Sequence, residues 1–66
     1  MKFNERLKNI RKERNLTQKA IYTILKVSPN CYASWEQGRT QPDIENIINL
    51  CKIFNVSADY LLGLED

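Results

Sequence analysis

The side chains most able to do chemistry in this sequence are uncharged hydrogen-bonding groups that gather between residues 28 and 41. Serine, asparagine and glutamine donate and accept hydrogen bonds, and arginine adds a fixed positive charge. Such groups bind base edges and phosphate oxygens of a nucleic acid without covalent chemistry. With two apolar neighbours included, the candidates are Ser28, Pro29, Asn30, Ala33, Ser34, Gln37, Arg39 and Thr40. A solvated loop is the alternative interpretation of Arg39 and Thr40.

The residue types in this sequence do not favour catalysis or metal binding. The sequence contains no histidine, so a serine or cysteine nucleophile has no imidazole base. Cys31 and Cys51 stand alone, without the paired spacing of a zinc site, and no glycine-rich phosphate loop occurs. We therefore expect no metal, no cofactor, no substrate-sized cleft and no enzymatic activity. Cys51 is most simply a small core residue, and Cys31 is expected to be partly exposed.

The segment from Leu16 to Arg39 must position the candidate residues, and it contains the start and stop signals of two short helices. Thr17 is a good N-cap, and Ser28 followed by Pro29 marks a second helix start. Gly38 supplies a left-handed stop. These signals predict helices over 18–25 and 29–37. The spacing fits a helix-turn-helix, in which the second helix enters the major groove of DNA, and fits an ordinary pair of antiparallel helices equally well.

Two aromatic residues fix the expected orientation of the second helix. Tyr32 and Trp35 are three residues apart and share one face, which we expect to point inward. The opposite face then carries Asn30, which suits an adenine edge, Ser34, which suits several bases, and Ala33, which suits a thymine methyl group. No lysine or arginine lies within 29–37, so any sequence preference is expected to be modest or to lean toward A·T pairs.

The remaining elements are also predicted to be helical. Helices are expected at Asn4–Arg14, at Ile44–Phe54 and over 58–64, with Asn15 and Asn55 as left-handed stops. The helix at 44–54 is apolar over more than half its circumference and is expected to be the central core helix. Core positions are expected on the helix at 18–25 at Ile21, Ile24 and Leu25. Side chains at the end of the chain are expected to contribute to a dimer seam: Tyr60, Leu61, Leu62 and Leu64.

Length and charge place the chain among small globular domains. Its 66 residues are expected to form one domain, 1–66, near the size at which a single core is only marginally stable. Residues 1–33 carry a net charge of +6 and residues 34–66 a net charge of −4. This asymmetry suits a polyanionic partner, although a solvated, salt-bridged first helix is the simpler explanation. Neither a signal peptide nor a membrane-spanning run is present, so we expect a cytoplasmic protein without a membrane partner.

Several short motifs in order resemble one family. They are L-T-Q at 16–18, V-S at 27–28, W-E-x-G at 35–38, Pro42, and F-N-V-S-A-D-Y-L-L at 54–62. Together they resemble the lambda-repressor and Cro-type (XRE) helix-turn-helix domain over nearly the whole chain. The resemblance implies an all-α, compact five-helix domain with the helix-turn-helix at helices two and three. It also implies a homodimer on double-stranded operator DNA in bacteria or their phages.

The resemblance assigns roles to individual residues. Gln18 would bind a phosphate or brace the reading helix, Ser28 would touch the DNA backbone, and Gln37 and Arg39 would contact flanking phosphates. Arg11 and Glu36 match the family's buried ion pair, which ties helix one to helix three. The chain departs from the family pattern at four positions, which bear mainly on sequence specificity: Tyr22, Lys26, Pro29 and Tyr32.

Two functions follow as hypotheses. The first is a transcriptional regulator, a repressor in the simplest case, that binds a palindromic operator. No small-molecule ligand domain is expected in 66 residues, so occupancy alone would cause repression. The alternative is a protein-interaction module of the same fold, such as an antitoxin, anti-repressor or assembly partner. The apolar helix at 29–37, whose outward positions carry no charge, motivates this alternative.

Overall fold

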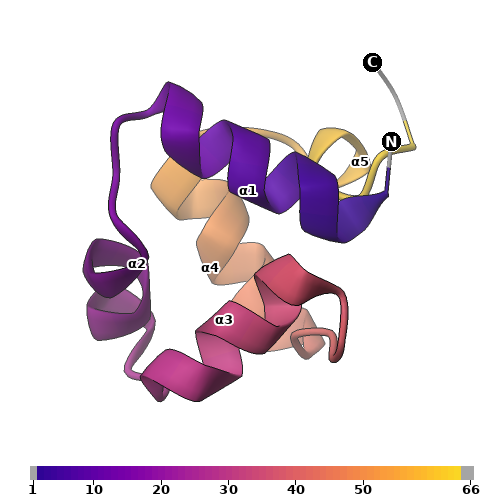
Figure 1. Cartoon of the computed structure of the whole chain (residues 1–66). Helices are drawn as coiled ribbons and strands as arrows, with labels where there is room; N and C mark the ends of the chain where they lie inside the picture. Colours follow the sequence, from indigo (N-terminus) through magenta and orange to yellow (C-terminus); the bar gives the residue numbers. More distant parts are fainter. Residues whose placement is uncertain (1, 65–66) are drawn as a thin grey trace.

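The computed structural model of the chain describes residues 2–64, which form five α-helices and no strand (Figure 1). The all-α fold class is therefore confirmed. The helices are α1 (Phe3–Glu13), α2 (Gln18–Leu25), α3 (Pro29–Gln37), α4 (Ile44–Phe54) and α5 (Ala58–Leu61). The bounds predicted for α2, α3 and α4 are confirmed.

Four of the helices begin at a side-chain cap. In each, a hydroxyl or carboxylate oxygen accepts a hydrogen bond from the backbone N–H three residues later, at 3.0–3.1 Å. The bond satisfies a donor that the first helical turn would otherwise leave unpaired. The capping residues are Thr17, Ser28, Asp43 and Ser57.

Residues with positive φ end the longer helices or follow directly after them. The φ angles are 57° at Asn15, 59° at Lys26 and 57° at Asn55, and Gly38 has φ 78°. The expected stops at Asn15, Gly38 and Asn55 are therefore confirmed. Two predicted bounds were wrong: α1 spans Phe3–Glu13, one residue earlier than predicted at each end, and α5 ends at Leu61, before Gly63 turns the chain with φ 81°.

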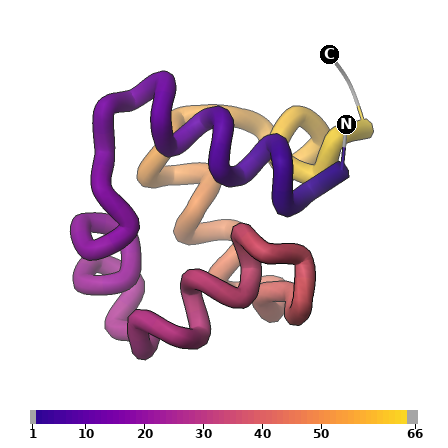
Figure 2. Tube along the Cα trace, in the orientation of Figure 1, coloured from indigo at the N-terminus to yellow at the C-terminus, as the bar shows by residue number. Residues whose placement is uncertain are grey.

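The helices surround one interior. In Figure 1, α1 crosses the top of the view and α3 the bottom, and α4 lies behind and between them. The trace in Figure 2 shows α2 closing one side, while α5 returns to lie beside the first half of α1. The arrangement leaves the outer side of α3 at the edge of the molecule. No helix between residues 2 and 64 has the length and apolarity to cross a membrane.

The core draws on every helix. The buried apolar side chains are Leu7, Ile10, Ile21, Tyr32, Trp35, Leu50, Phe54 and Leu61. Partly buried residues such as Leu16 and Val27 pack against them across the connections. The turn segments therefore share the burial that stabilises the helices.

Several expected core positions are wrong. Ile24 is 60% exposed, so only Ile21 of that face of α2 is fully buried. Helix α4 lies in the middle of the fold, yet Ile44 is 79% exposed and Ile48 49% exposed. A short chain has too few helices to cover a helix that is apolar over more than half its circumference. Leu61 belongs to the core and is therefore unavailable for a dimer seam.

Candidate nucleic-acid interface

The turn between α2 and α3 sets the direction of the candidate reading helix. Lys26 takes the left-handed conformation, and its N–H donates to Thr23 O at 3.3 Å. The Val27 N–H donates to Tyr22 O at 3.1 Å, so two carbonyls at the end of α2 are satisfied. Ser28 then caps α3, with Pro29 in its first turn. A lysine thus closes this turn where a glycine would adopt the same conformation at lower cost.

Helix α3 presents a buried aromatic face and an accessible polar face. Tyr32 and Trp35 are 0% and 3% exposed, and their rings meet edge-to-face with centroids 5.6 Å apart. Pro29, Asn30 and Gln37 are exposed on the other side. Ala33 and Ser34 are half-buried there, as is Cys31. The inward orientation predicted for the two aromatic residues is confirmed.

A buried ion pair joins α1 to α3. Arg11 Nε donates to Glu36 Oε2 at 2.6 Å, and Arg11 Nη2 donates to Glu36 Oε1 at 3.1 Å. Gln18 Nε2 donates to the same Oε1 at 3.0 Å. The Gln18 amide is thus turned toward Glu36 and braces α3, the second of the two roles considered for it. The bidentate geometry fixes α3 relative to α1 and α2.

The environment of Glu36 favours its charged form. Burial alone would raise the pKa of this carboxyl, but the hydrogen bonds that the carboxylate accepts, the largest effect among them coming from Arg11, outweigh burial and hold the pKa below its ordinary value. The hydrogen bond to Glu36 raises the pKa of Arg11 in return. The two charges stabilise one another, so both groups remain ionised near neutral pH.

The hydroxyl groups expected to meet DNA already have partners within the chain. Ser28 Oγ accepts from Cys31 N at 3.0 Å as the α3 cap. Ser34 Oγ donates to Cys31 O at 2.8 Å and lies 2.6 Å from Thr40 Oγ1. At the end of α3, Arg39 Nη1 donates to Gln37 Oε1 at 3.3 Å. Asn30 and Pro29 are the exposed residues nearest the start of the helix.

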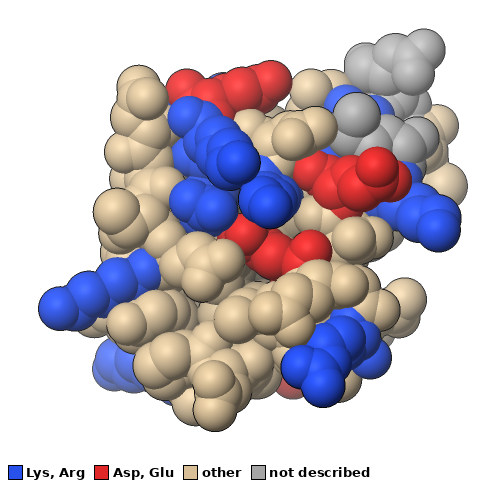
Figure 3. Space-filling view, viewed as in Figure 1, with Lys and Arg blue, Asp and Glu red and all other residues tan. Residues whose placement is uncertain are grey.

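Positive charge flanks the uncharged surface of α3. In the space-filling view of Figure 3, the lower surface, where α3 lies, is mostly tan, and lysine or arginine groups lie on either side of it. Exposed cations near the two motif helices are Lys19, Lys26 and Arg39. The only ionisable carboxylate within α3 is the buried Glu36. An uncharged strip between cations suits a DNA groove lying between two phosphate backbones.

Two contacts that position the site were not predicted from the sequence. The Arg6 guanidinium carbon lies 4.2 Å from the centroid of the Tyr60 ring, which links α1 to α5. Gly38 packs against the side chain of Asn4. A Cβ added to Gly38 would lie 3.2 Å from the side-chain amide of Asn4. Gly38 was recognisable as a helix stop because it is a glycine. No local sequence pattern indicates that Arg6 contacts Tyr60 or that Gly38 contacts Asn4.

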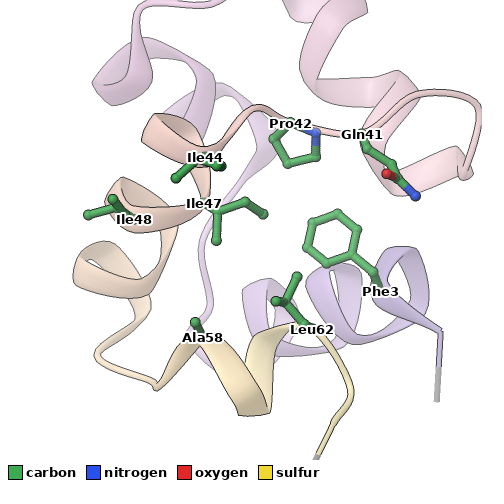
Figure 4. Close-up of a pocket in the computed structure, with 8 residues that line it drawn as sticks. All are labelled: Phe3, Gln41, Pro42, Ile44, Ile47, Ile48, Ala58 and Leu62. Carbon is green, nitrogen blue, oxygen red and sulfur yellow. The ribbon is translucent and has the colours of Figure 1, made fainter.

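The structure also contains a cavity that the sequence gave no reason to expect. Its volume is about 550 Å³, which contradicts the expectation that no substrate-sized cleft exists. Figure 4 shows Phe3, Pro42, Ile47 and Leu62 directed toward a common space between α1, α4 and α5. This apolar groove is lined by Phe3, Gln41, Pro42, Ile44, Ile47, Ile48, Ala58 and Leu62. Its lining contains no ionisable side chain, so it offers no acid or base.

Comparison with known proteins assigns the fold to a family. A family model described as a helix-turn-helix domain matches residues 4–66. The transcriptional activator BcrR of Enterococcus faecalis is 38% identical over 66 residues, which is 100% of this chain and 32% of BcrR. The chain spans between about a third and about half the length of the curated relatives compared first.

Two solved structures match the whole arrangement of helices. A transcriptional regulator from Listeria innocua superposes with a TM-score of 0.90 at 35% identity, covering 98% of this chain and 61% of that one. The P22 c2 repressor, solved in complex with a synthetic operator, superposes with a TM-score of 0.88 at 32% identity and covers 98% of both chains. The repressor C2 of Salmonella phage P22 is also similar in sequence, at 36% identity over 60 residues, which is 91% of this chain and 28% of C2. The chain belongs to the helix-turn-helix family of lambda-repressor-like (XRE) domains.

Proposed function

We propose that this chain is a DNA-binding domain of a bacterial or phage transcriptional regulator, in the simplest case a repressor, and that α3 lies in the major groove of double-stranded operator DNA. The observation that carries the proposal is the orientation of α3. Its aromatic residues are buried, and its outer side is uncharged and lies between exposed cations. The operator-bound P22 c2 repressor supports the same placement by its similarity over 98% of both chains.

Individual residues take distinct roles in this proposal. Asn30 is exposed and suits an adenine edge, while the half-buried Ala33 suits a thymine methyl group. Arg39 supplies a cation for a phosphate next to the groove, and Gln37 lies beside it. Gln18, Arg11 and Glu36 hold α3 in place and do not themselves touch DNA. We propose no catalytic role for any of these groups, and the chain has no histidine.

We further propose that the chain acts as a homodimer whose two copies meet at the apolar groove. Gln41 and Pro42, which line the groove, lie in the loop that joins α3 to α4. Its rim exposes Ile44 at 79%, Ile48 at 49% and Leu62 at 40%. A twofold axis through this rim would place two α3 helices on one side of a duplex. Exposed apolar side chains gathered in one place are typical of such interfaces.

Selection of bound sequences from a random duplex pool tests the proposal. We expect enrichment of two-fold symmetric sites whose half-site centres lie about one helical turn, roughly 34–36 Å, apart. Fluorescence anisotropy on an enriched duplex is expected to show affinity falling steeply with salt, because bound lysine and arginine displace counterions. A pool that shows no enrichment at low salt would contradict the proposal.

A protein-interaction module remains the second candidate because the outer side of α3 carries no charge. Asn30→Ala and Ala33→Glu separate the two functions. In the DNA-binding account, both substitutions weaken binding to the selected duplex, by loss of a base contact and by phosphate repulsion respectively. DNA affinity that is unchanged in both variants would favour the module.

A further inference from the structure

The hydroxyl groups of Ser34 and Thr40 form a pair whose hydrogens are both committed within the protein. A serine hydroxyl has one hydrogen and two acceptor lone pairs. Ser34 donates its hydrogen to Cys31 O at 2.8 Å. The 2.6 Å contact between Ser34 Oγ and Thr40 Oγ1 must therefore use the hydrogen of Thr40. Neither hydroxyl keeps a hydrogen for a DNA acceptor.

This assignment limits what each hydroxyl can do at DNA. A phosphate oxygen only accepts hydrogen bonds, so Thr40 Oγ1 cannot bind one while its hydrogen lies on Ser34. The thymine O4 and guanine O6 edges are also acceptors, and Ser34 Oγ has no hydrogen for them. The pair thus excludes every contact in which Ser34 or Thr40 would donate a hydrogen bond to DNA.

The backbone of Ser34 holds the same loop. Its carbonyl accepts from Arg39 N at 2.9 Å and from Thr40 N at 3.4 Å. On the other side, Gly38 packs against the Asn4 side chain. A Cβ at residue 38 would fit only if the Asn4 side chain moved. The segment 38–40 is therefore held from α3 and from α1. Arg39, the cation proposed to reach a phosphate, lies inside this held segment.

We propose that Ser34 is a positioning residue, which fixes Thr40 and thereby presents Arg39 to the DNA backbone, and that it does not read a base. The inference rests on the proposed function, and it reassigns one residue of the reading helix. It predicts that Ser34 and Thr40 act as one unit. Their loss affects the strength of binding and its salt dependence, and leaves the preferred sequence unchanged.

The test compares Ser34→Ala, Thr40→Val and the double variant on a selected duplex and on duplexes changed at one base pair. Each single variant is expected to bind about fivefold more weakly, the net contribution of one hydrogen bond. The double variant is expected to bind no more weakly than either single one, because the lost interaction is shared. The slope of log affinity against log salt is expected to fall by about one, the loss of one phosphate contact. Base preference is expected to stay that of the wild type.

Thr40→Ser keeps the hydroxyl and is the matched control, expected to bind as the wild type does. Amide hydrogen exchange at Arg39 and Thr40 in the DNA-free protein gives a second readout. We expect exchange to be faster than in the wild type in Ser34→Ala and in Thr40→Val, and unchanged in Thr40→Ser. A changed base preference at one position in Ser34→Ala but not in Thr40→Val would overturn the inference. Unchanged exchange together with an unchanged salt slope would also overturn it. A wild-type chain that binds no duplex would instead contradict the proposed function.

Discussion

At the scale of single residues, the bond between Arg11 and Glu36 connects packing to function, because it joins α1 to the helix proposed to enter DNA. The two side chains are 12% and 3% exposed. Arg11→Met leaves the Glu36 carboxylate buried without its cationic partner. We expect a loss of about 3 kcal/mol in the free energy of unfolding, measured by urea denaturation.

The double variant Arg11→Met/Glu36→Leu is the control for this prediction. Replacing both charges with apolar groups removes the uncompensated carboxylate, so we expect most of the lost stability to return. If the double variant were less stable than Arg11→Met, the cost would lie in side-chain packing and not in the unpaired charge.

The lowered pKa of Glu36 also makes stability depend on pH. Because folding lowers this pKa below its ordinary value of 4.5, the folded chain binds the proton less tightly than the unfolded chain. The stabilisation is therefore complete above about pH 4.5 and is lost as the pH falls through the folded-state pKa. We expect the difference in unfolding free energy between the wild type and Glu36→Gln to shrink below pH 4.5. A difference that stays constant from pH 7 to pH 3 would contradict this.

Sequence reasoning placed some site residues well and missed others for a physical reason. Tyr32 and Trp35 were found because a three-residue spacing fixes a shared helical face. Ser34 shares the accessible side of the same helix, but its hydroxyl donates to Cys31 O and contacts Thr40 Oγ1, six residues away across the loop. The sequence places a side chain on a face, and it does not specify which partner satisfies its hydrogen bonds.

At the scale of elements, the turn before α3 carries a measurable strain. Lys26 has φ 59°, a conformation that costs a residue with a Cβ roughly 1 kcal/mol and glycine almost nothing. We expect Lys26→Gly to raise the free energy of unfolding by about 0.5–1 kcal/mol, measured by urea denaturation. Lys8→Gly, at an exposed position in the middle of α1, is the matched control and is expected to lower it by about 1 kcal/mol. If Lys26→Gly lowered the free energy of unfolding as much as Lys8→Gly does, the turn would not be strained.

Helix boundaries were predictable because capping chemistry is local. The caps at Thr17, Ser28 and Asp43 and the positive-φ asparagines act within one turn of each helix end. Burial was less predictable because it depends on which elements cover a face. Ile21 and Ile24 lie on the same short helix, yet one is 0% exposed and the other 60%. The apolar groove was missed for the same reason.

At the scale of the whole molecule, the groove and the reading helix are proposed to work together. The molecule measures 29 × 22 × 21 Å, so two copies in contact can place their α3 helices about one DNA turn, roughly 34–36 Å, apart. We expect Ile44→Gln/Ile48→Gln to shift sedimentation toward the monomer. We also expect it to weaken binding to a full symmetric site much more than binding to a half-site.

Ile24→Gln is the matched control, because Ile24 is an exposed isoleucine on α2 that does not line the groove. It is expected to leave both association and binding to the full site unchanged. If Ile24→Gln disrupted association and the groove variant did not, the dimer surface would have to lie on α2.

The central claim is that the outer side of α3 meets DNA, and amide chemical-shift mapping during titration with a selected duplex tests it most directly. The account predicts shift changes concentrated between Ser28 and Gln41, with the largest changes at Asn30, Ala33 and Arg39. Changes concentrated on the exposed surface of α4 and α5, with α3 unaffected, would contradict it.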